Sequence, residues 1–575
     1  MKNFKRKSMC LTLAAGISAS GMALADWDNS LGGVHVNSDG TGQVLLYPYY
    51  TTRAGMDTYL SVINTTSDVK AVKVRFLESR NSREVLDFNL YLSPYDMWTA
   101  AVVDTGTGAK VITADKSCTT PAIPAGGQAF VNYAYTGTVD NEDKIPGAPG
   151  INIGGRDGET QSLDRTREGY FEIIEMGTIH NENYQKYITH VDGVPDDCSK
   201  LQGLRDGDEV SKLGISAPRG GLAGSASLVT PAFGTDFSYD PVALDNFANH
   251  EIWHQAGSIE PDLRHGIDQS VVFYDQRVVR STWQNTGGYG NSDADKDSVN
   301  AVNAVLMHNS VINEFVLDNI TLSGTDWVVT MPTKRYSVPV KDPNNDSHDS
   351  YEAFPPFSST FWENGACEPV DIAYWDREER QHVVGGFSPP PPGVNNALCW
   401  EANVVTFNNS NILNSAHSVN IAVQDFQNGW VRMTFDEDLH NQTSNEGHFY
   451  HGLPLIGFMV QDFVNNNAAP NVMATYGGSF QHKFTTYIDG NLPPPPPPCE
   501  GDQCEPPPPP PPPPPTACLW PQVLVTQGLD PSQVDTCVHQ NVCESNPNYH
   551  GDAIKTDING NPQPSGKYGI CVPAV

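Results

Sequence analysis

The chain has 575 residues, 34 Lys+Arg against 67 Asp+Glu, and a formal net charge of −33. This length suits about two to four domains with sizeable cores. Charged residues make up 18% and hydrophobic residues 38%, which excludes a coiled coil and a wholly disordered chain. A charge this negative repels phosphates, so it excludes nucleic-acid binding as the main role and disfavours docking on anionic lipids.

The N-terminus predicts export. Basic residues between Lys2 and Lys7 precede an apolar stretch, Leu11–Leu24, and Ala23-Leu24-Ala25 fits the small-x-small cleavage rule. We therefore expect residues 1–25 to be a signal peptide. The mature protein is then extracellular or at the outer cell surface, with the periplasm as the alternative. No later apolar run reaches membrane-spanning length, so we expect no transmembrane segment after signal removal.

Strand patterns dominate the mature chain. Apolar residues recur with a period of two in Val44–Tyr50, Thr58–Asn64, Val72–Phe76 and Leu86–Leu92, and similar runs continue to Val460. Short strands separated by turns predict an all-β fold of one or two antiparallel β-sandwich domains. We place the first sandwich over residues 26–220, a second β-rich domain over residues 221–490, and long loops over residues 137–168 and 286–298.

Cysteines and prolines predict how the chain is held together. Ten of the 11 cysteines follow the signal peptide, and an even number in an exported chain predicts disulfides, with metal thiolates as the alternative. Cys118 is a natural partner for Cys198, as Cys367 is for Cys399. The sequence leaves open the pairing of the other candidates, which are Cys499, Cys504, Cys518, Cys537, Cys543 and Cys571.

The C-terminal part predicts a spacer and a small module. Pro493–Pro498 and Pro506–Pro515 favour a stiff polyproline II spacer over residues 491–517. Residues 518–575 are too few for a stable core and would form a Cys-rich module stapled by disulfides. We expect this module to reach a surface polymer, a glycan or a protein partner. Resistance to proteolysis is the alternative role.

One motif matches a metal site. His250-Glu251-Ile252-Trp253-His254 is H-E-x-x-H, which on a helix places both imidazoles on one face to bind zinc, with Glu251 as general base. Asp240-Pro241 is a suitable helix start and Gly257 a suitable end. The extended motif resembles that of the metzincin proteases, except that Glu260 stands where that family has a third His. His265 is a further candidate ligand.

Chance is the competing explanation of this motif, and we favour it. Asn249 and Trp253 replace the aliphatic residues usual in such helices. The segments upstream also lack the alternating helices and strands that a zinc peptidase domain needs. The peptidase therefore remains the alternative function, with His250, His254 and Glu260 or His265 as ligands.

Calcium is a second candidate ion. Asp293, Asp295 and Asp297 place carboxylates at alternate positions, as in calcium loops. The sixth and twelfth positions counted from Asp293 hold Ser298 and Ala304, not the Gly and Glu of an EF-hand. A solvated turn is the alternative interpretation.

Several phrases resemble an uncharacterised family of exported, β-rich bacterial surface proteins. They are Gly42–Thr51, Tyr59–Thr65, Val72–Trp98, Gly257–Leu263, Trp327–Tyr336 and Gly452–Met459. The resemblance covers roughly residues 40–490 and implies location and β-rich character, but no activity. It also implies that Gly257–Leu263 belongs to the shared pattern while H-E-x-x-H does not, which leaves Glu260 in a loop.

Together these patterns predict a structural or adhesive binding protein of the cell surface or extracellular matrix, more readily a non-enzyme than an enzyme. Its acidic, turn-rich surface is suited to divalent cations such as calcium. Zinc is expected only for the metallopeptidase alternative. A third candidate is a carbohydrate-binding protein that acts through the tail module.

Overall fold

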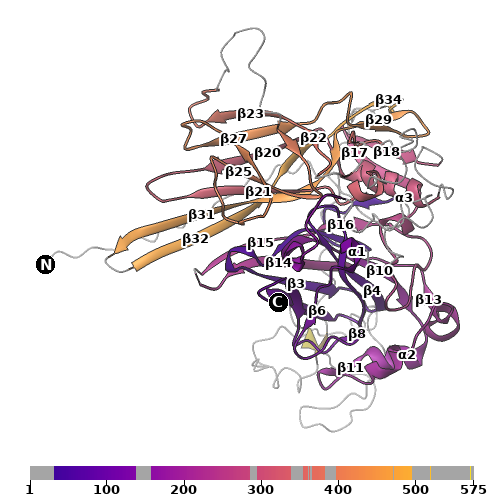
Figure 1. Cartoon of the computed structure of the whole chain (residues 1–575). Coiled ribbons are helices and arrows are strands. Elements are labelled where there is room, and N and C mark those ends of the chain that lie inside the picture. Colours follow the sequence, from indigo (N-terminus) through magenta and orange to yellow (C-terminus); the bar gives the residue numbers. More distant parts are fainter. Residues whose placement is uncertain are drawn as a thin grey trace. The chain divides into compact units, whose positions relative to one another are not determined.

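Strands form where apolar and polar residues alternate, as in β3 (Asp57–Asn64), whose side chains point in turn toward and away from the core. In this computed structural model the strands build two antiparallel β-sandwiches, which confirms the predicted all-β fold (Figure 1). The structure describes residues 32–136, 157–232, 234–284, 294–338, 354–359, 362, 365–381, 396–469, 472–494, 518–519 and 570–571. The predicted signal peptide and most of the predicted proline spacer and tail module lie outside these residues.

The first sandwich pairs two sheets. Sheet I has the order β1 (His35–Val36), β16 (Val242–Asp245), β2 (Val44–Thr51), β10 (Glu168–Ile179), β4 (Val69–Glu78), β5 (Glu84–Leu92) and β8 (Cys118–Thr120), with β13 (Ile215–Ser216) paired to β10. Sheet II has the order β15 (Thr235–Tyr239), β14 (Leu222–Thr230), β3, β6 (Met97–Asp104), β7 (Ala109–Ile112) and β9 (Gln128–Ala129). Their facing side chains form one core, in which the rings of Tyr47 and Phe171 stack 4.2 Å apart.

The second sandwich also pairs two sheets. Sheet III has the order β26 (Ser418–Ile421), β25 (Ala402–Phe407), β21 (Gly324–Thr330), β31 (Ile456–Ala469) and β32 (Val472–Gln481). Sheet IV has the order β23 (Asp371–Asp376), β27 (Asn428–Thr434), β20 (Ser310–Val316) and β33 (Lys483–Thr485). Trp327 of sheet III and Phe315 of sheet IV lie in the core between them. Within these sheets only β25 and β26 pair in parallel.

Short elements surround the sandwiches. Small strand groups are β11 (His190–Val191) with β12 (Val194–Pro195), β17 (Gln269–Tyr274) with β18 (Arg277–Thr282), β19 (Met307–His308) with β30 (Leu453–Pro454), β22 (Glu368–Pro369) with β24 (Ala397–Leu398), and β28 (Asn441–Thr443) with β29 (His448–His451) and β34 (Tyr487–Gly490). The helices are α1 (Tyr133–Thr136), α2 (Glu182–Ile188) and α3 (Ala294–Leu306), with short helical turns η2 (Arg53–Gly55), η3 (Leu163–Arg167), η4 (Cys198–Leu201), η5 (Glu209–Leu213), η6 (Leu263–His265) and η7 (Lys334–Tyr336). Among the described residues, none of the helices has the length and apolar character needed to cross a membrane.

The sandwiches share a core. β14, which follows residue 220, pairs with β3 along its length, and β16 pairs with β2, so residues 222–245 complete the first sandwich. The outer face of sheet III packs on the first sandwich, where the Tyr239 and Phe458 rings stack 4.3 Å apart. Residues 28–496 accordingly form one compact unit.

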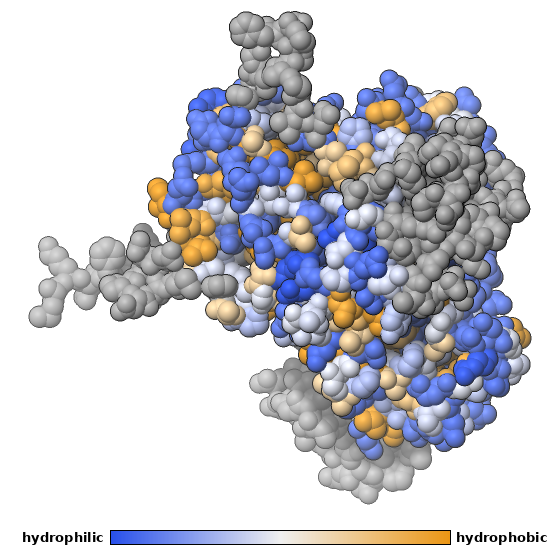
Figure 2. Space-filling view, viewed as in Figure 1, coloured by the Kyte–Doolittle hydropathy of each residue, from blue (hydrophilic) through white to orange (hydrophobic). Residues whose placement is uncertain are grey.

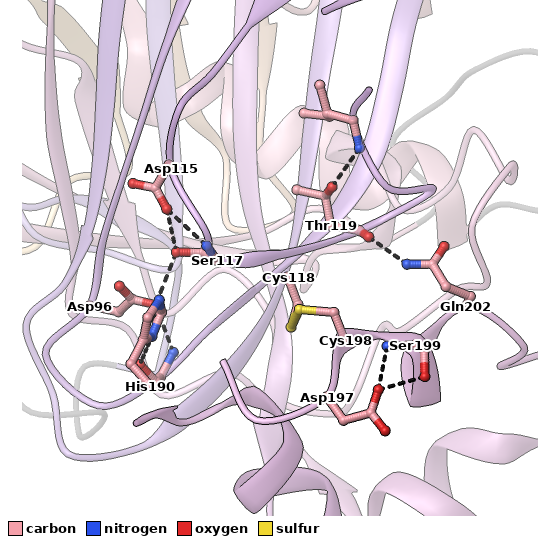
Figure 3. The surroundings of a disulfide bond; sticks show 12 residues. Asp96, Asp115, Ser117, Cys118, Thr119, His190, Asp197, Cys198, Ser199 and Gln202 are labelled. Atoms are coloured by element: carbon pink, nitrogen blue, oxygen red, sulfur yellow. Dashed lines mark hydrogen bonds and ion pairs between the residues drawn. A yellow bond between two sulfur atoms is a disulfide. The ribbon is translucent and has the colours of Figure 1, made fainter. Parts of the chain in front are cut away.

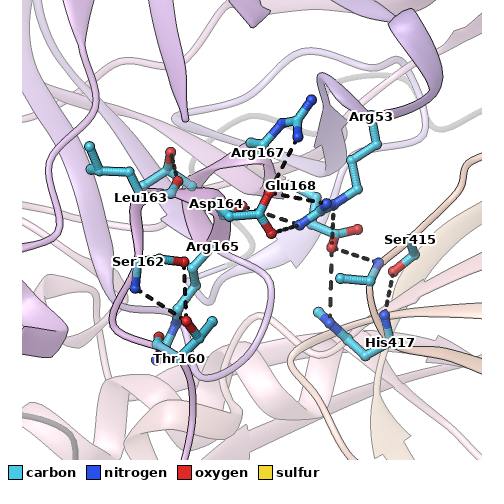
Figure 4. Close-up of polar contacts among 12 residues, drawn as sticks. Arg53, Thr160, Ser162, Leu163, Asp164, Arg165, Arg167, Glu168, Ser415 and His417 are labelled. Atoms are coloured by element: carbon cyan, nitrogen blue, oxygen red, sulfur yellow. Dashed lines mark hydrogen bonds and ion pairs between the residues drawn. The ribbon is translucent and has the colours of Figure 1, made fainter. Parts of the chain in front are cut away.

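A buried carboxylate also joins the two sandwiches (Figure 4). Glu168 begins β10, and its Oε1 accepts hydrogen bonds from Arg53 Nε at 2.8 Å and from the backbone N of Ala416 at 3.0 Å. Ala416 and His417 lie in the loop that connects β25 to β26. Burial opposes the charge of Glu168, but His417 and Arg53 outweigh burial and lower the pKa of this carboxyl.

Two disulfides confirm two predicted pairings. Cys118–Cys198 joins β8 to η4, and beside it Gln202 Nε2 donates to the carbonyl O of Thr119 at 2.9 Å (Figure 3). Cys367–Cys399 lies beside the paired strands β22 and β24. In the tail, the backbones of β35 (Cys518–Leu519) and β36 (Ile570–Cys571) pair antiparallel. Cys499, Cys504, Cys537 and Cys543 lie outside the described residues.

Asp326 of β21 makes stability depend on pH. Burial raises the pKa of this carboxyl from 3.8 to about 6, although its Oδ2 accepts from the backbone N of Leu413 at 2.9 Å. The folded state therefore holds the proton more tightly than the unfolded state. The contribution of Asp326 to stability is therefore most favourable below pH 4, and it falls by about 3 kcal/mol as the pH rises to about 6.

We expect Asp326→Asn to raise the free energy of unfolding at pH 7 by about 1–3 kcal/mol, because it removes a buried charge and keeps the acceptor for Leu413. Urea unfolding between pH 4 and 7 measures this change, and the loss of stability between pH 4 and 6 should shrink in the variant. The exposed Asp425→Asn serves as the control and should keep the parent profile. A lower stability of Asp326→Asn at pH 7 would contradict the assignment.

Candidate metal centre

The segment that carries H-E-x-x-H is not a helix. Residues 242–245 form β16, and residues 249–262 run as a loop to the short turn η6. Without helical spacing, His250 and His254 do not share a face. His250 is exposed, its Nδ1 lies 3.2 Å from Asn249 Oδ1, and it lines a cavity of about 760 Å³ on the first sandwich. The helix over residues 241–256 that the metallopeptidase alternative requires is therefore not formed.

The loop nevertheless gathers three of the predicted ligands. His254, Glu260 and His265 each offer one ligating atom, and these atoms lie within 4.8 Å of one another. His254 Nδ1 is 3.6 Å from Glu260 Oε2, and His265 Nε2 is 3.9 Å from Glu260 Oε1. The two imidazole rings lie 5.5 Å apart at 74°. Among the described residues this is the one group of three or more such side chains with that proximity.

A buried carboxylate stands behind His265. Asp262 is fully buried, and its Oδ1 lies 3.3 Å from His265 Nδ1, on the ring edge opposite the nitrogen that faces Glu260. Nδ1 accepts from the backbone N of Asp262 at 3.2 Å in one tautomer and donates to Asp262 Oδ1 in the other, and the second tautomer leaves the Nε2 lone pair for a metal. This carboxylate–imidazole–metal relay is the usual second shell of a metal-binding histidine.

Two residues of sheet I fix the loop backbone at both ends of His254–Ser258. Lys73 of β4 donates from Nζ to the carbonyl O of Ser258, and it also pairs with Asp87. Asn89 of β5, the cross-strand neighbour of Lys73, donates from Nδ2 to the carbonyl O of His254 at 2.9 Å. These two hydrogen bonds hold the loop that carries His254 against sheet I.

The surroundings shift the pKa values of the two histidines in opposite directions. Burial lowers the pKa of His254 despite the nearby charge of Glu260, which favours the neutral, ligating imidazole. Burial also opposes the charged form of His265, but its hydrogen bond to Asp262 and the charges of Asp262 and Glu260 outweigh burial and raise its pKa. Burial acts on Asp262 as well, yet Arg264 and His265 hold the pKa of that carboxyl well below its usual range. A dication at this group would face one carboxylate, Glu260, with a second, Asp262, behind the His265 ring.

The donor set has the chemistry of a transition-metal site. Two imidazole nitrogens and one carboxylate oxygen suit Zn²⁺, and a tetrahedral ion would keep its fourth position for water or another ligand. The side chains of His254, Glu260 and His265 are 26%, 39% and 24% exposed, so the group opens to solvent. An ion could therefore enter without opening the core.

The predicted calcium loop takes another form. Asp295 and Asp297 belong to helix α3, so the long loop predicted over residues 286–298 is wrong from Ala294 onward. A helical backbone is not the loop on which the calcium prediction depends. Asp293 lies outside the described residues.

Sequence reasoning missed the residues that support the site. Asp262, Lys73 and Asn89 were not singled out, although Asp262 lies within the phrase Gly257–Leu263. Lys73 belongs to an alternation of apolar and basic residues in β4, and its basic side chains Lys70, Lys73 and Arg75 are all fully buried. Such an alternation is the usual pattern of a strand with one face in solvent, so it gave no signal that the basic face is covered.

Comparison with known proteins adds no relative. No family model, no curated protein and no solved structure matches the chain. The resemblance to an exported bacterial family thus stays a prediction. Glu260 does lie in a loop, as that resemblance implied.

Proposed function

We propose that this chain is an exported binding protein of the cell surface that holds one zinc ion on its first sandwich, through His254, Glu260 and His265. The observation that carries the proposal is the convergence of these three donor atoms within 4.8 Å, with Asp262 behind one imidazole. The two disulfides are consistent with an oxidising compartment. The proline-rich tail would carry the protein's contact with a polymer, glycan or protein partner.

The ion would act in binding rather than in peptide hydrolysis. In the peptidase motif the helix presents both histidines to the metal and places Glu251 beside the bound water. Here the loop conformation separates His250 from the ligand group and removes the geometry on which the role of Glu251 depends. Zinc would instead bridge His254 and His265 and so tie the loop to the turn η6.

Zinc binding to the purified, oxidised protein tests the proposal. After dialysis against metal-free buffer and addition of zinc, we expect about one tightly bound ion per chain and a rise of the melting temperature. His254→Ala and His265→Ala should each abolish tight binding, since two remaining ligands hold zinc poorly. Calorimetry gives the affinity, and elemental analysis after gel filtration gives the stoichiometry.

His250→Ala is the matched control, because it removes a histidine of the same motif that lies outside the ligand group. It should bind zinc as the parent does. Loss of zinc in His250→Ala would restore the H-E-x-x-H site, and absence of zinc from the parent would overturn the proposal. Asp262→Asn should weaken affinity by about 10- to 100-fold while the chain stays folded by circular dichroism.

A further inference from the structure

Sheet IV presents a groove on the face turned away from its core. The groove has a volume of about 490 Å³ and runs over β20 and β27. Its lining includes Ile312, Glu314, Arg377, Asn428, Trp430 and Lys483. In Figure 2 the surface over β20, β23 and β27 mixes apolar and polar residues. Apolar and hydrogen-bonding groups therefore meet within one depression.

An indole forms a firm wall of this groove. Trp430 lies opposite Trp375 in the β23–β27 pair, and their rings stack 4.1 Å apart at 13°. Trp375 does not line the groove, so it supports Trp430 from the side away from the depression. Glu314 is the neighbour of Trp430 on the other flank, in β20. A half-buried indole held in this way offers a flat apolar surface at low entropic cost.

Cations flank the indole in an otherwise acidic protein. Ile312 has Arg432 as its neighbour on β27 and Lys483 as its neighbour on β33, and Arg377 lies at the end of β23. Glu314 and Glu378 are acidic side chains nearby, and Glu378 pairs with Arg377. Asp371 of β23 lies on the same face, so three cations and three carboxylates make this surface near neutral on a chain of net charge −33.

We propose that this groove binds a polysaccharide that carries carboxylates, with one sugar ring stacked on Trp430. The apolar face of a pyranose matches an indole, Asn428 and Glu314 offer partners for hydroxyl groups, and the cations complement the sugar carboxylates. This site lies on the second sandwich, involves none of the zinc ligands, and does not rest on the proposed metal function.

Affinity electrophoresis of the full chain through gels that contain polygalacturonate, or the neutral polymer dextran, tests the proposal. We expect retardation by polygalacturonate only. Trp430→Ala should weaken binding about tenfold, because it removes the stacking surface. Lys483→Glu should weaken it at low salt and much less at high salt, because it reverses one exposed charge. Trp430→Phe should retain most of the binding and shows that Trp430→Ala acts through lost stacking.

The matched control is Tyr476→Ala on β32. Tyr476 is also an exposed aromatic in a stacked pair, 5.1 Å from Phe463, but it lies on sheet III. It should bind polygalacturonate as the parent does. Unretarded parent protein, equal retardation by dextran, or equal losses in Tyr476→Ala and Trp430→Ala would each overturn the proposal.

Discussion

Arg165→Met should lower the free energy of unfolding by about 3–5 kcal/mol, because it leaves a buried carboxylate without its cation. Arg165 is fully buried, and its guanidinium donates to Glu78 Oε2 at 2.8 Å and to Asn81 Oδ1 at 2.5 Å. It also lies over the Tyr135 ring at 4.4 Å. Urea unfolding at pH 7 measures the loss.

The ion pair between Arg165 and Glu78 also makes the stability of the parent protein fall at acid pH. Burial opposes the charge of Glu78, but Arg165 and the backbone N–H groups of Arg83 and Arg80 outweigh burial and lower its pKa from 4.5 to about 2. Glu78 therefore contributes about 3 kcal/mol above pH 4.5, which is lost as the pH falls toward 2. The double variant Arg165→Met/Glu78→Gln should regain part of the stability that Arg165→Met loses. A single variant within 1 kcal/mol of the parent would contradict this account.

Removal of the Cys118–Cys198 disulfide should cost about 4 kcal/mol, because the bridge constrains a long loop in the unfolded chain. The two cysteines are 80 residues apart, and Cys118 is buried beside β5. We expect Cys118→Ser/Cys198→Ser to show this loss in urea unfolding under oxidising conditions.

The second disulfide provides the comparison. Cys367 and Cys399 are only 32 residues apart, so Cys367→Ser/Cys399→Ser should lose about 0.8 kcal/mol less, by the logarithm of the loop lengths. Adding reductant to either variant should remove only the contribution of the remaining bridge. A larger loss from the shorter loop would show that native packing at the bridge, and not loop closure, sets the stability.

Local alternation predicted the strands well. Val44–Tyr50, Thr58–Asn64, Val72–Phe76 and Leu86–Leu92 all lie in strands β2 to β5, because period-two patterning is a property of adjacent residues. The same patterning did not reveal that the basic face of β4 is covered. That covering depends on residues near 258, which are remote in the sequence.

The local helix signals near the metal group also failed because contacts with residues remote in the sequence override them. Asp240-Pro241 is compatible with a helix start, but Val242–Asp245 pairs with β2, and this tertiary contact decides the local structure. Conversely, Val299, Val302 and Leu306 have helical spacing in α3, and this pattern competes with the loop predicted over residues 286–298. Sequence patterns predicted His254, Glu260 and His265 as ligands together with His250. The conformation of the loop, which the sequence did not reveal, excludes His250 from the group.

The shared core has a consequence for how the chain reaches its native state. Val404 and Phe458 belong to the same cluster as Leu45 and Tyr47, so the core of the first sandwich is finished by residues some 400 positions later. Contacts of such long sequence separation slow folding, and they prevent the first sandwich from maturing as a chain emerges N-terminus first. The apolar side chains of the early strands therefore stay partly exposed until β25 and β31 have been synthesised and pack on them. Apolar surface exposed during this interval favours aggregation of the incompletely folded chain.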